Sequence, residues 1–364
     1  MRVGVLGGGQ LGRMLALAGY QLGVQFRFFD PSSGAPVGQI GELIAARYDD
    51  HDALSRFLDG TDVATYEFES IPLEAVRFVA DRIPVYPPLR ALEVAQDRLL
   101  EKQLFRELGI PVPEFSAVES ASQLGQEASR IGFPVVLKTR RLGYDGKGQV
   151  VIRDASSLET AWKALAGSPL IIEKYVAFEY EASIIGVRDG KGRAVFYPPV
   201  ENVHRDGILR TATAPSRNVS RDQADAAIEY SRRIMDHFDY VGVLALELFS
   251  VDGTLLANEM APRVHNSGHW TIEGSETSQF ENHLRAILSL PLGSTALRGR
   301  SAMMNIIGHL PPREGVLAID GAHLHLYGKS PTERRKLGHV TVVADSPEAI
   351  DQRMTALAQV LGPG

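Results

Sequence analysis

The beginning of the chain combines short apolar runs with one apolar segment of helical spacing. Residues 3–6 predict a buried strand, and residues 11–18 predict a helix that follows a glycine-rich turn. A second strand is expected over residues 20–30, ending at Asp30. Strand, turn, helix and strand in this order are typical of a right-handed βαβ unit, so we expect a parallel α/β sheet here.

Two more apolar segments extend this predicted sheet. Residues 63–69 and 83–86 have the composition of strands, and two prolines at 87–88 end the series. A single helix is expected over residues 91–108, because its apolar positions share one face and Gly109 follows it. We therefore place the end of the first domain near residue 90.

The middle of the chain alternates short strands with helices. Strands are predicted at residues 135–138, 149–152, 170–175, 182–187, 194–197 and 241–249. This density of hairpin-like strands beside helices favours an α+β domain. Further on, the segments 303–308, 322–327 and 340–343 predict a small β-rich unit. The expected organisation is an α/β domain at residues 1–90, an α+β domain at 91–295 and a β-rich domain at 296–364.

The composition indicates a globular protein with small-molecule partners. Of the 364 residues, 44% are hydrophobic and 23% charged, without an uninterrupted apolar stretch of about 18 residues. The N-terminus carries no signal-peptide pattern, so we expect a cytoplasmic protein with no membrane span. The absence of cysteine excludes disulfides, thiolate metal sites and cysteine nucleophiles. A net charge of −6 argues against a nucleic-acid partner.

The glycine-rich turn at residues 7–12 is a candidate dinucleotide site. Gly7, Gly9 and Gly12 match the pattern G-x-G-x-x-G, and Asp30 stands 18 residues after Gly12. In nicotinamide-dependent enzymes such a motif holds the pyrophosphate, and an acidic residue about 20 residues later binds the ribose. An NAD-dependent oxidoreductase is therefore one hypothesis, although it gives no role to the carboxylates later in the chain.

A second glycine-rich segment, GYDGKGQ at residues 143–149, follows the predicted strand that ends at Lys138. Its glycines allow backbone N–H groups to point at an anion, and Lys147 adds a positive charge. Asp145 and Gly146 between two strands also predict a hairpin turn. The segment is thus a phosphate-binding loop, a hairpin tip or both. Lys138 is either a strand-end lysine in solvent or a phosphate ligand.

Two carboxylates occur in apolar strands of the second domain. Glu247 lies within an apolar run, and Glu259 follows Asn258 at the end of the next strand. A buried carboxylate must be paired or ligate a metal. A three-residue loop centred on Gly253 would place Glu247 opposite Glu259, whereas a two-residue turn would place it opposite Asn258. Facing carboxylates favour Mg²⁺ between them; the alternative is a basic partner for each, with Arg263 as a candidate.

The polar loop that follows, APRVHNSGHW, is a candidate anion site. Arg263, His265 and Asn266 come directly after a predicted buried strand, where binding groups gather. Arginine and protonated histidine pair with oxyanions through charge-assisted hydrogen bonds. His269 is more typical of a structural histidine.

These motifs together resemble one family of ATP-grasp enzymes. The segments are GVLGGGQLGRML, TYEFES, DRLLEKQLF, GYDGKGQ, FYPPVENVHRDGILRTA, NEMAPRVHNSGHWT and RRKLGH, which span nearly the whole chain. The strand lysine, the glycine loop and the paired acids resemble ATP-grasp enzymes in general. GYDGKGQ together with APRVHNSGHWT resembles the 5-(carboxyamino)imidazole ribonucleotide synthetases of purine biosynthesis.

The resemblance implies an ATP-grasp architecture with an N-terminal Rossmann-like domain, a central ATP-grasp domain and a small C-terminal β-rich domain. The implied ATP contacts are Arg98, Lys138, Gly143, Tyr144, Asp145, Gly146, Lys147, Gly148, Gln149, Glu173, Lys174, Tyr175, Val176, Glu181, His204, Asn258 and Glu259. The implied Mg²⁺ ligands are Glu247 and Glu259. The implied contacts to the acceptor or bicarbonate are Tyr144, Asp145, Arg210, Arg263, His265, Asn266, Lys329, Arg335 and Lys336.

The family's reaction converts ATP and bicarbonate into ADP and carboxyphosphate, and then carboxylates the exocyclic amine of 5-aminoimidazole ribonucleotide. The resemblance implies that Arg98 and Lys138 meet phosphates, that residues 173–176 contact adenine, and that Glu181 holds the ribose. It also implies a homodimer. The alternatives are the NAD-dependent oxidoreductase, another ATP-grasp ligase such as a formate-dependent glycinamide ribonucleotide transformylase or a biotin-dependent carboxylase, and a nucleotide-binding module without turnover.

Overall fold

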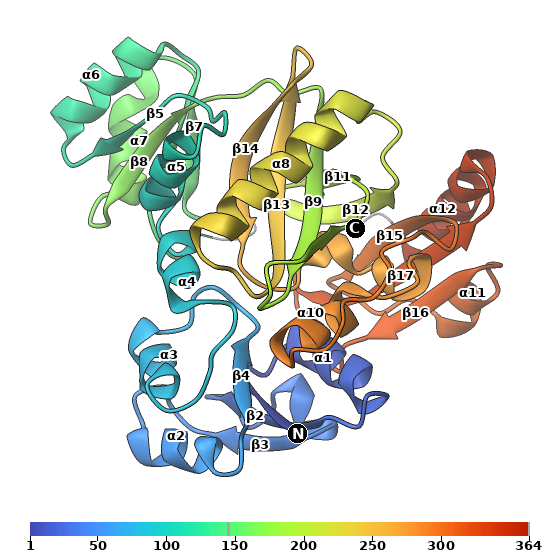
Figure 1. Cartoon of the computed structure of the whole chain (residues 1–364). Coiled ribbons are helices and arrows are strands. Elements are labelled where there is room, and N and C mark those ends of the chain that lie inside the picture. The colour runs from blue at the N-terminus through green and yellow to red at the C-terminus, as the bar shows by residue number, and fades with distance from the viewer. Residues whose placement is uncertain (144–145, 363–364) are drawn as a thin grey trace.

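The computed structural model describes residues 1–143 and 146–362. These residues form three β-sheets (Figure 1). The first sheet belongs to the N-terminal lobe and the second to a small lobe at the other end of the molecule. The third and largest lies between them and extends to the C-terminal strands. No helix among the described residues is long and apolar enough to cross a membrane.

The first sheet is parallel, with the strand order β3-β2-β1-β4. Its strands are β1 (Arg2–Leu6), β2 (Gln25–Asp30), β3 (Glu42–Ala45) and β4 (Val63–Tyr66). The helical segments of this lobe are α1 (Gln10–Tyr20), η1 (Pro36–Gln39), α2 (His51–Leu58) and α3 (Leu73–Ala80). The predicted βαβ unit is confirmed, because β1 and β2 pair in parallel with α1 between them.

Three details predicted for this sheet are wrong. Tyr20 ends α1 and does not start a strand, because β2 begins only at Gln25. The strand predicted at residues 63–69 stops at Tyr66. Residues 83–86 contribute a single bridge to β4, and the fourth strand of the sheet is β3, which the apolar pattern did not show.

The single helix predicted at residues 91–108 is two helices, α4 (Leu89–Ala95) and α5 (Arg98–Glu107). The break lies at Gln96 and Asp97. The Gln96 amide donates to two carbonyl oxygens of the N-terminal lobe. The Asp97 carboxylate accepts a backbone N–H as the N-cap of α5. These side-chain bonds to the backbone stabilise the interruption.

The small lobe contains an antiparallel sheet of order β5-β8-β6-β7. Its strands are β5 (Phe115–Val118), β6 (Val135–Thr139), β7 (Gln149–Ile152) and β8 (Leu170–Lys174). The helical segments that accompany it are α6 (Ala121–Ile131), η2 (Ala155–Ser157) and α7 (Leu158–Leu165). Apolar side chains of α6 and α7 pack with Val135 and Leu137 of β6 in one core.

The largest sheet has the order β14-β13-β9-β11-β12-β15-β17-β16, with β10 beside β9. Its strands are β9 (Tyr180–Arg188), β10 (Ala194–Phe196), β11 (Val200–Arg205), β12 (Ile208–Ala214), β13 (Gly242–Val251), β14 (Thr254–Ala261), β15 (Arg300–Ile307), β16 (Ala322–Leu326) and β17 (Lys336–Ala344). The helical segments around it are α8 (Arg221–His237), η3 (Asn266–Gly268), α9 (Thr271–Gly274), α10 (Gln279–Ile287), α11 (Arg313–Leu317) and α12 (Pro347–Leu361).

Both faces of β13 are covered, which explains its nearly continuous apolar sequence. Leu244 and Leu246 belong to the core that α8 closes, while Val243 and Ala245 belong to the core that α10 closes. Successive side chains on a strand point to opposite faces, so a strand between two helices is apolar at every position.

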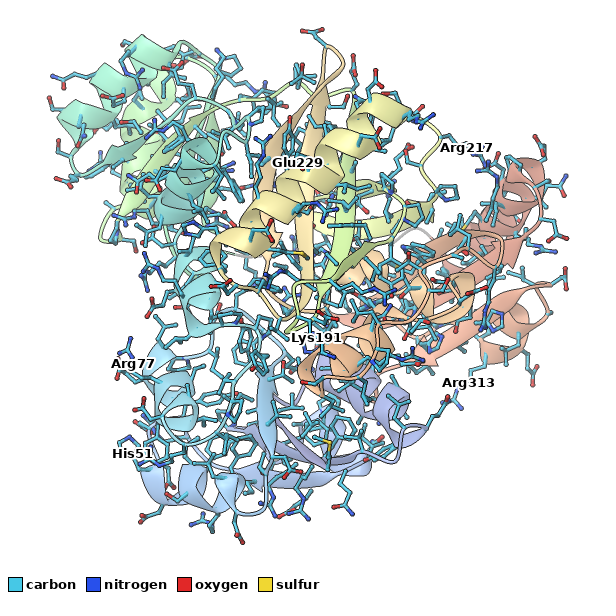
Figure 2. All side chains as sticks on the ribbon, in the orientation of Figure 1. His51, Arg77, Lys191, Arg217, Glu229 and Arg313 are labelled. Atoms are coloured by element: carbon cyan, nitrogen blue, oxygen red, sulfur yellow. The ribbon has the colours of Figure 1, made fainter. Side chains whose placement is uncertain are left out.

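The predicted C-terminal β-rich unit does not form a sheet of its own. β15 pairs with β12 from Thr211–Met304 to Ala214–Ser301, so the C-terminal strands continue the largest sheet. Arg217 adds an ion pair of 2.9 Å to Asp351 of α12, and Figure 2 shows Arg217 on the side of α8 that faces the C-terminal helices. The predicted strands are confirmed, and their sheet is continuous with that of the preceding domain.

A buried histidine joins the first sheet to the largest one. His283 of α10 accepts the N–H of Val243 at Nδ1 (3.1 Å). Its Nε2 therefore carries the proton and donates to Thr65 Oγ1 of β4 (2.9 Å). Burial lowers the pKa of His283 to about 3, so the imidazole is neutral at neutral pH.

This histidine makes the stability of the protein depend on pH. The pKa of His283 in the folded state lies below the value of about 6.5 expected in the unfolded chain, so the unfolded state binds more protons. The contribution of neutral His283 to the unfolding free energy is fully present above about pH 6.5 and is lost as the pH falls towards the pKa of His283 in the folded state. Between pH 7.5 and 5.5, we expect the wild type to lose about 1.4 kcal/mol more unfolding free energy than His283→Gln. Urea unfolding at both pH values measures this difference; an equal loss in the two proteins would contradict the assignment.

Candidate active site

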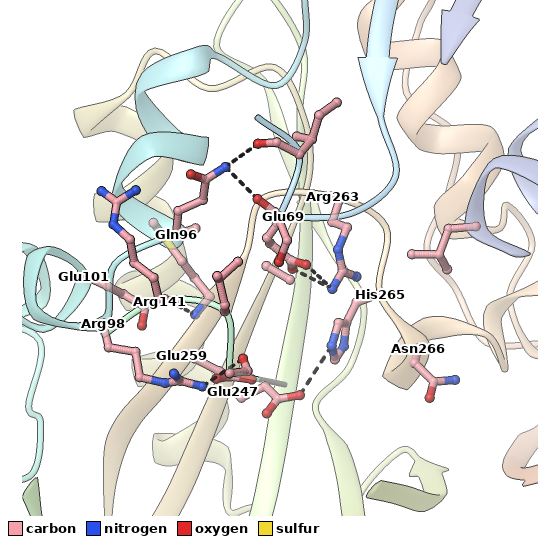
Figure 3. A pocket seen from close by; sticks show the side chains of 18 of the residues that line it. Glu69, Gln96, Arg98, Glu101, Arg141, Glu247, Glu259, Arg263, His265 and Asn266 are labelled. Atoms are coloured by element: carbon pink, nitrogen blue, oxygen red, sulfur yellow. Dashed lines mark hydrogen bonds and ion pairs between the residues drawn. The ribbon is translucent and has the colours of Figure 1, made fainter. Parts of the chain in front are cut away.

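Two adjoining pockets lie where the small lobe, the largest sheet and the N-terminal lobe meet. The first, here the N-terminal pocket, includes Gln10, Glu69 and Arg263 in its lining (Figure 3). The second, here the lobe pocket, lies between the two antiparallel sheets and includes Lys138 and Val176. Both pockets are lined by Arg98, His204, Gly207, Glu247 and Glu259, so together they form one continuous site.

Glu247 of β13 and Glu259 of β14 are direct neighbours across the ladder at this junction (Figure 3). The turn between the two strands has two residues, which alone would pair Glu247 with Asn258. A β-bulge at Asn258 shifts the ladder by one residue and brings Glu259 opposite Glu247 instead. The sequence left two alternatives open, and each is half right. The turn has two residues, as in the alternative that paired Glu247 with Asn258, but Glu247 faces Glu259, as in the alternative with a three-residue loop.

The facing carboxylates repel one another, and Glu247 is largely buried whereas Glu259 is exposed. Burial and the charge of Glu259 raise the pKa of Glu247 to about 7. His204 lies close by and forms an ion pair of 2.8 Å with Glu181. Burial lowers the pKa of His204, but its hydrogen bond to Glu181 and the charge of Glu247 raise it above its ordinary value overall. Negative charge is therefore concentrated at the Glu247–Glu259 pair, where a bound cation would relieve the repulsion.

The donor set fits Mg²⁺. Carboxylate oxygens are the ligands that this hard cation prefers. Within residues 1–143 and 146–362, no group of three or more histidine, cysteine, aspartate or glutamate side chains is placed to hold a metal ion by itself. A cation at Glu247 and Glu259 would therefore complete its shell with water and phosphate oxygens, as Mg²⁺ does at nucleotide sites.

Lys138 of β6 reaches the lobe pocket and is held there by Glu173 of β8. Its Nζ lies 3.0 Å from Glu173 Oε2, and Lys102 Nζ lies 3.6 Å from the same oxygen. Burial would raise the pKa of Glu173, but the two lysines lower it to about 2. The side chain of Glu173 thus faces Lys138 and Lys102 at the wall of the lobe pocket.

The strands on either side of the second glycine loop form a hairpin, as predicted, while the turn predicted at Asp145 and Gly146 includes a residue outside the described ones. β6 and β7 pair antiparallel as far as Lys138 and Gln149. Arg98 donates to the carbonyl oxygen of Gly143 (2.9 Å), and a Cβ at Gly143 would lie 2.5 Å from this guanidinium. Gly146 has a φ of +76° and approaches the backbone of residues 206–207 in the β11–β12 turn. Glycine is therefore required at both positions.

The loop after β14 has different partners from those the sequence suggested. Arg263 forms an ion pair of 2.5 Å with Glu69 and not with Glu247 or Glu259, so its proposed role as their partner is wrong (Figure 3). His265 Nε2 lies 3.4 Å from Glu247 Oε1. Burial and the charges of Arg263 and Lys336 hold the pKa of His265 well below its ordinary value. His265 is thus neutral near pH 7, and its predicted contact with an anion stays a prediction.

The first glycine motif is already occupied by side chains of the chain itself. The N–H groups of Gly9 and Gly12 donate to the Glu67 carboxylate, which is 6% exposed. The N–H of Gly8 donates to Asp30 (2.8 Å). The N–H groups at the start of α1 and the Asp30 carboxylate thus already have partners within the chain. They are not available for the pyrophosphate and ribose of a nicotinamide cofactor, which contradicts that hypothesis.

Known protein families match the chain in three consecutive parts. A model described as the ribonucleotide synthetase preATP-grasp domain matches residues 1–96. The ATP-grasp domain matches residues 103–280, and the phosphoribosylaminoimidazole carboxylase C-terminal domain matches residues 301–353. The predicted ATP-grasp architecture is confirmed, while the boundaries near residues 90 and 295 stay predictions.

The chain is 51% identical to the N5-carboxyaminoimidazole ribonucleotide synthase of Pseudomonas aeruginosa over 342 residues, which are 94% of each chain. The chain belongs to the N5-carboxyaminoimidazole ribonucleotide synthase family. A solved family structure from Thermus thermophilus is 52% identical, with a TM-score of 0.96 over 100% of this chain and 99% of its own. Another, from Aspergillus clavatus in complex with ADP and 5-aminoimidazole ribonucleotide, is 34% identical, with a TM-score of 0.92 over 99% and 98% of the two chains.

Most residues that the family resemblance implied lie in the two pockets. The lobe pocket is lined by Arg98, Lys138, Gly146, Lys147, Gln149, Glu173, Lys174, Tyr175, Val176, Glu181, His204, Glu247, Asn258 and Glu259. The N-terminal pocket adds Gly143, Arg263, His265, Asn266 and Lys336. Tyr144 and Asp145 lie outside the described residues.

Four of the described residues implied by the family line neither pocket: Gly148, Arg210, Lys329 and Arg335. Lys329 is nevertheless adjacent to the N-terminal pocket, because it donates to the Gln10 side chain at the start of α1. Arg335 is exposed and donates to the carbonyl oxygen of Ser330 (3.3 Å). Their roles in the family's reaction stay predictions.

The sequence reasoning missed Glu69, Glu101 and Lys102. Glu69 pairs with Arg263, which no local pattern can show. Glu101 and Lys102 precede the buried Leu104 and Phe105 on α5 by three residues, so they share the buried face of the helix. The sequence could have revealed Glu101 and Lys102, because they are charged residues at positions of an amphipathic helix that face the core.

The raised pKa of Glu247 predicts that cation binding releases a proton. With a pKa of about 7, Glu247 is roughly half protonated at pH 7, and a metal ion bound to the carboxylate displaces that proton. We expect the binding of Mg²⁺ together with ADP to release up to about 0.5 proton at pH 7 and much less at pH 8.5. Calorimetry in buffers with different ionisation enthalpies measures the release. Glu247→Gln serves as the control, and proton uptake by the wild type at pH 7 would contradict the prediction.

Proposed function

We propose that this chain uses ATP and bicarbonate to carboxylate the exocyclic amine of 5-aminoimidazole ribonucleotide in de novo purine biosynthesis, giving 5-carboxyaminoimidazole ribonucleotide. The observation that carries this proposal is the meeting of the two pockets at Glu247 and Glu259. A nucleotide in one pocket and an acceptor in the other would approach each other at the carboxylate pair. A family member of the same fold has been solved in complex with ADP and 5-aminoimidazole ribonucleotide, which supports this arrangement.

The lobe pocket is the proposed site of ATP. The backbone of residues 173–176 would contact adenine, and Glu181 would accept hydrogen bonds from the ribose. Arg98, Lys138 and Lys147 bring positive charge to the same pocket and would face the phosphates. Lys138 is suited to this role, because its ion pair with Glu173 holds the ammonium group at the pocket wall.

Glu247 and Glu259 would hold Mg²⁺, which neutralises phosphate charge when it is bound. Asn258 lines the lobe pocket beside them and would contact the nucleotide. The neutral His265 would orient the Glu247 carboxylate from the other side.

The N-terminal pocket is the proposed site of the acceptor and bicarbonate. Arg263, held by Glu69, and Asn266, hydrogen-bonded to Asn305, have fixed positions there and would bind bicarbonate. Lys336 lines this pocket, and Lys329 borders it through Gln10. Both would meet the phosphate of the acceptor, with Arg210 and Arg335 more peripheral. The side chains of Tyr144 and Asp145 are expected to reach the acceptor from the glycine loop.

The proposed chemistry has two transfers. An oxygen of bicarbonate attacks the γ-phosphorus of ATP, which forms carboxyphosphate and releases ADP. The exocyclic amine then attacks the carboxyl carbon, so a C–N bond forms, phosphate leaves and the amine loses a proton. The enzyme would contribute positioning, charge neutralisation and exclusion of water from the labile carboxyphosphate. A cytoplasmic location and a homodimer are further proposals that rest on the family alone.

Acceptor-stimulated turnover tests this function. We expect ADP release from ATP, Mg²⁺ and bicarbonate to rise when 5-aminoimidazole ribonucleotide is added, and to require Glu259, since the Glu259→Gln side chain lacks the charge that binds the cation. The variant should lose at least about a hundredfold in kcat. Formate with glycinamide ribonucleotide is the control for the related transformylase. If ADP release does not respond to 5-aminoimidazole ribonucleotide, the proposal is wrong.

Lys336→Ala tests the acceptor site separately. Removing a charge-assisted contact to phosphate should raise the KM for 5-aminoimidazole ribonucleotide about tenfold or more and change the KM for ATP little. Steady-state kinetics with each substrate varied in turn measures both constants, and the exposed Lys163→Ala in α7 is the control. An unchanged KM for the acceptor would remove Lys336 from the site.

A further inference from the structure

Two neighbouring charged residues of α5 are buried and have no role in the reaction as described so far. Glu101 is 2% exposed and Lys102 is 1% exposed. A charge in the interior is tolerated only where hydrogen bonds or opposite charges compensate for lost hydration. Leucine or methionine would serve better if this face of α5 had only to fill a core.

The contacts of Glu101 and Lys102 converge on the backbone of β14. Lys102 Nζ donates to the carbonyl oxygen of Ala257 (3.0 Å). Glu101 Oε1 accepts the N–H of Met260 (2.7 Å). β14 is the edge strand of the largest sheet, so these outward-facing groups have no neighbouring strand to bond. The two side chains thus make the hydrogen bonds that a neighbouring strand would make, one at residue 257 and one at residue 260, just before and just after residues 258–259.

Residues 258–259 are the point at which the register of β14 changes. Leu248 pairs with Ala257, whereas Glu247 pairs with Glu259, so Asn258 is the extra residue of a β-bulge. Without the bulge, Asn258 would stand opposite Glu247 and the Glu259 side chain would move to the other face of the sheet. The bonds from Glu101 and Lys102 therefore bracket the one irregularity that creates the carboxylate pair.

Lys102 also reaches the opposite wall of the lobe pocket. Its Nζ lies 3.6 Å from the carboxylate of Glu173, and Glu173 holds Lys138 at 3.0 Å. One buried ammonium group thus touches the strand that carries Glu259 and the carboxylate that orients Lys138. It joins the largest sheet to the sheet of the small lobe across the pocket.

We propose that Glu101 and Lys102 are positioning residues that fix the bulge of β14, and with it the separation of Glu259 from Glu247 and from Lys138. This inference rests on the proposed function in one respect, because it takes Glu247 and Glu259 as the cation site. Neither residue touches substrate in the proposal; both act through the β14 backbone, and Lys102 acts also through Glu173.

According to the proposal, position 101 needs a side-chain oxygen that accepts a backbone N–H, and it does not need a negative charge. Glu101 reaches β14 through one oxygen, which accepts the N–H of Met260. Glu101→Gln keeps an oxygen for the N–H of Met260, whereas Glu101→Ala leaves that N–H without a partner. Lys102→Met keeps the length of the side chain and removes its donors.

Mn²⁺ binding in the presence of ADP, followed by electron paramagnetic resonance, tests the proposal without turnover. We expect Glu101→Ala and Lys102→Met to weaken Mn²⁺ binding about tenfold or more, and Glu101→Gln to stay within about threefold of the wild type. Glu107→Ala, at an exposed position of the same helix, should bind Mn²⁺ like the wild type. The KM for 5-aminoimidazole ribonucleotide should change less than about twofold in Lys102→Met and Glu107→Ala, because neither residue lines the N-terminal pocket, whereas Glu101 does.

Amide hydrogen exchange of the wild type provides a second measurement that needs no variant to fold. The N–H of Met260 should be strongly protected, although it lies on an edge strand, and exchange at residues 257–260 should accelerate in Glu101→Ala. Unprotected exchange at Met260 in the wild type would overturn the proposal, as would normal Mn²⁺ affinity in a folded Glu101→Ala. Mn²⁺ binding that depends on Glu101 in an enzyme without acceptor-stimulated turnover would instead support the positioning role and contradict the proposed function.

Discussion

Side chains on a strand alternate between two faces, so two carboxylates can meet across an antiparallel ladder only where the register allows it. In β13 and β14 the turn alone would not bring Glu247 and Glu259 together, and a single inserted residue corrects the pairing. The charge of Glu259, which together with burial raises the pKa of Glu247, stands opposite Glu247 only because of this correction. A local backbone irregularity thus decides where negative charge accumulates in the molecule.

Charged side chains around the site are held by partners from distant parts of the chain. Glu69 of the N-terminal lobe holds Arg263, and Glu173 of the small lobe holds Lys138. Arg263 and Lys138 are therefore held in place before any ligand arrives, which reduces the entropy lost when a ligand binds. The pair of Arg263 with Glu69 also joins the largest sheet to the N-terminal lobe, whereas Lys138 and Glu173 lie on neighbouring strands of one sheet.

The parts of the site that were predictable from the sequence are those with local patterns. Lys138 at a strand end, the glycine hairpin and two acids in apolar strands each stand out within about ten residues of sequence. The bulge at Asn258 was not predictable, because the residues of the hairpin allow either register, and the pair of Glu69 with Arg263 was not, because it joins segments far apart in the chain. For the same reason the apolar pattern predicted β15, β16 and β17 but not the sheet that they join.

The pairing of β12 with β15 has a consequence for how this chain can be divided. A fragment ending before residue 300 would leave β12 as an open edge of a long, largely apolar sheet, with N–H and C=O groups that attract other strands. The C-terminal segment is therefore not a module that can be cut away or exchanged at a linker. A chimera between two relatives would have to cross over elsewhere or carry both sides of this β12–β15 seam from the same parent.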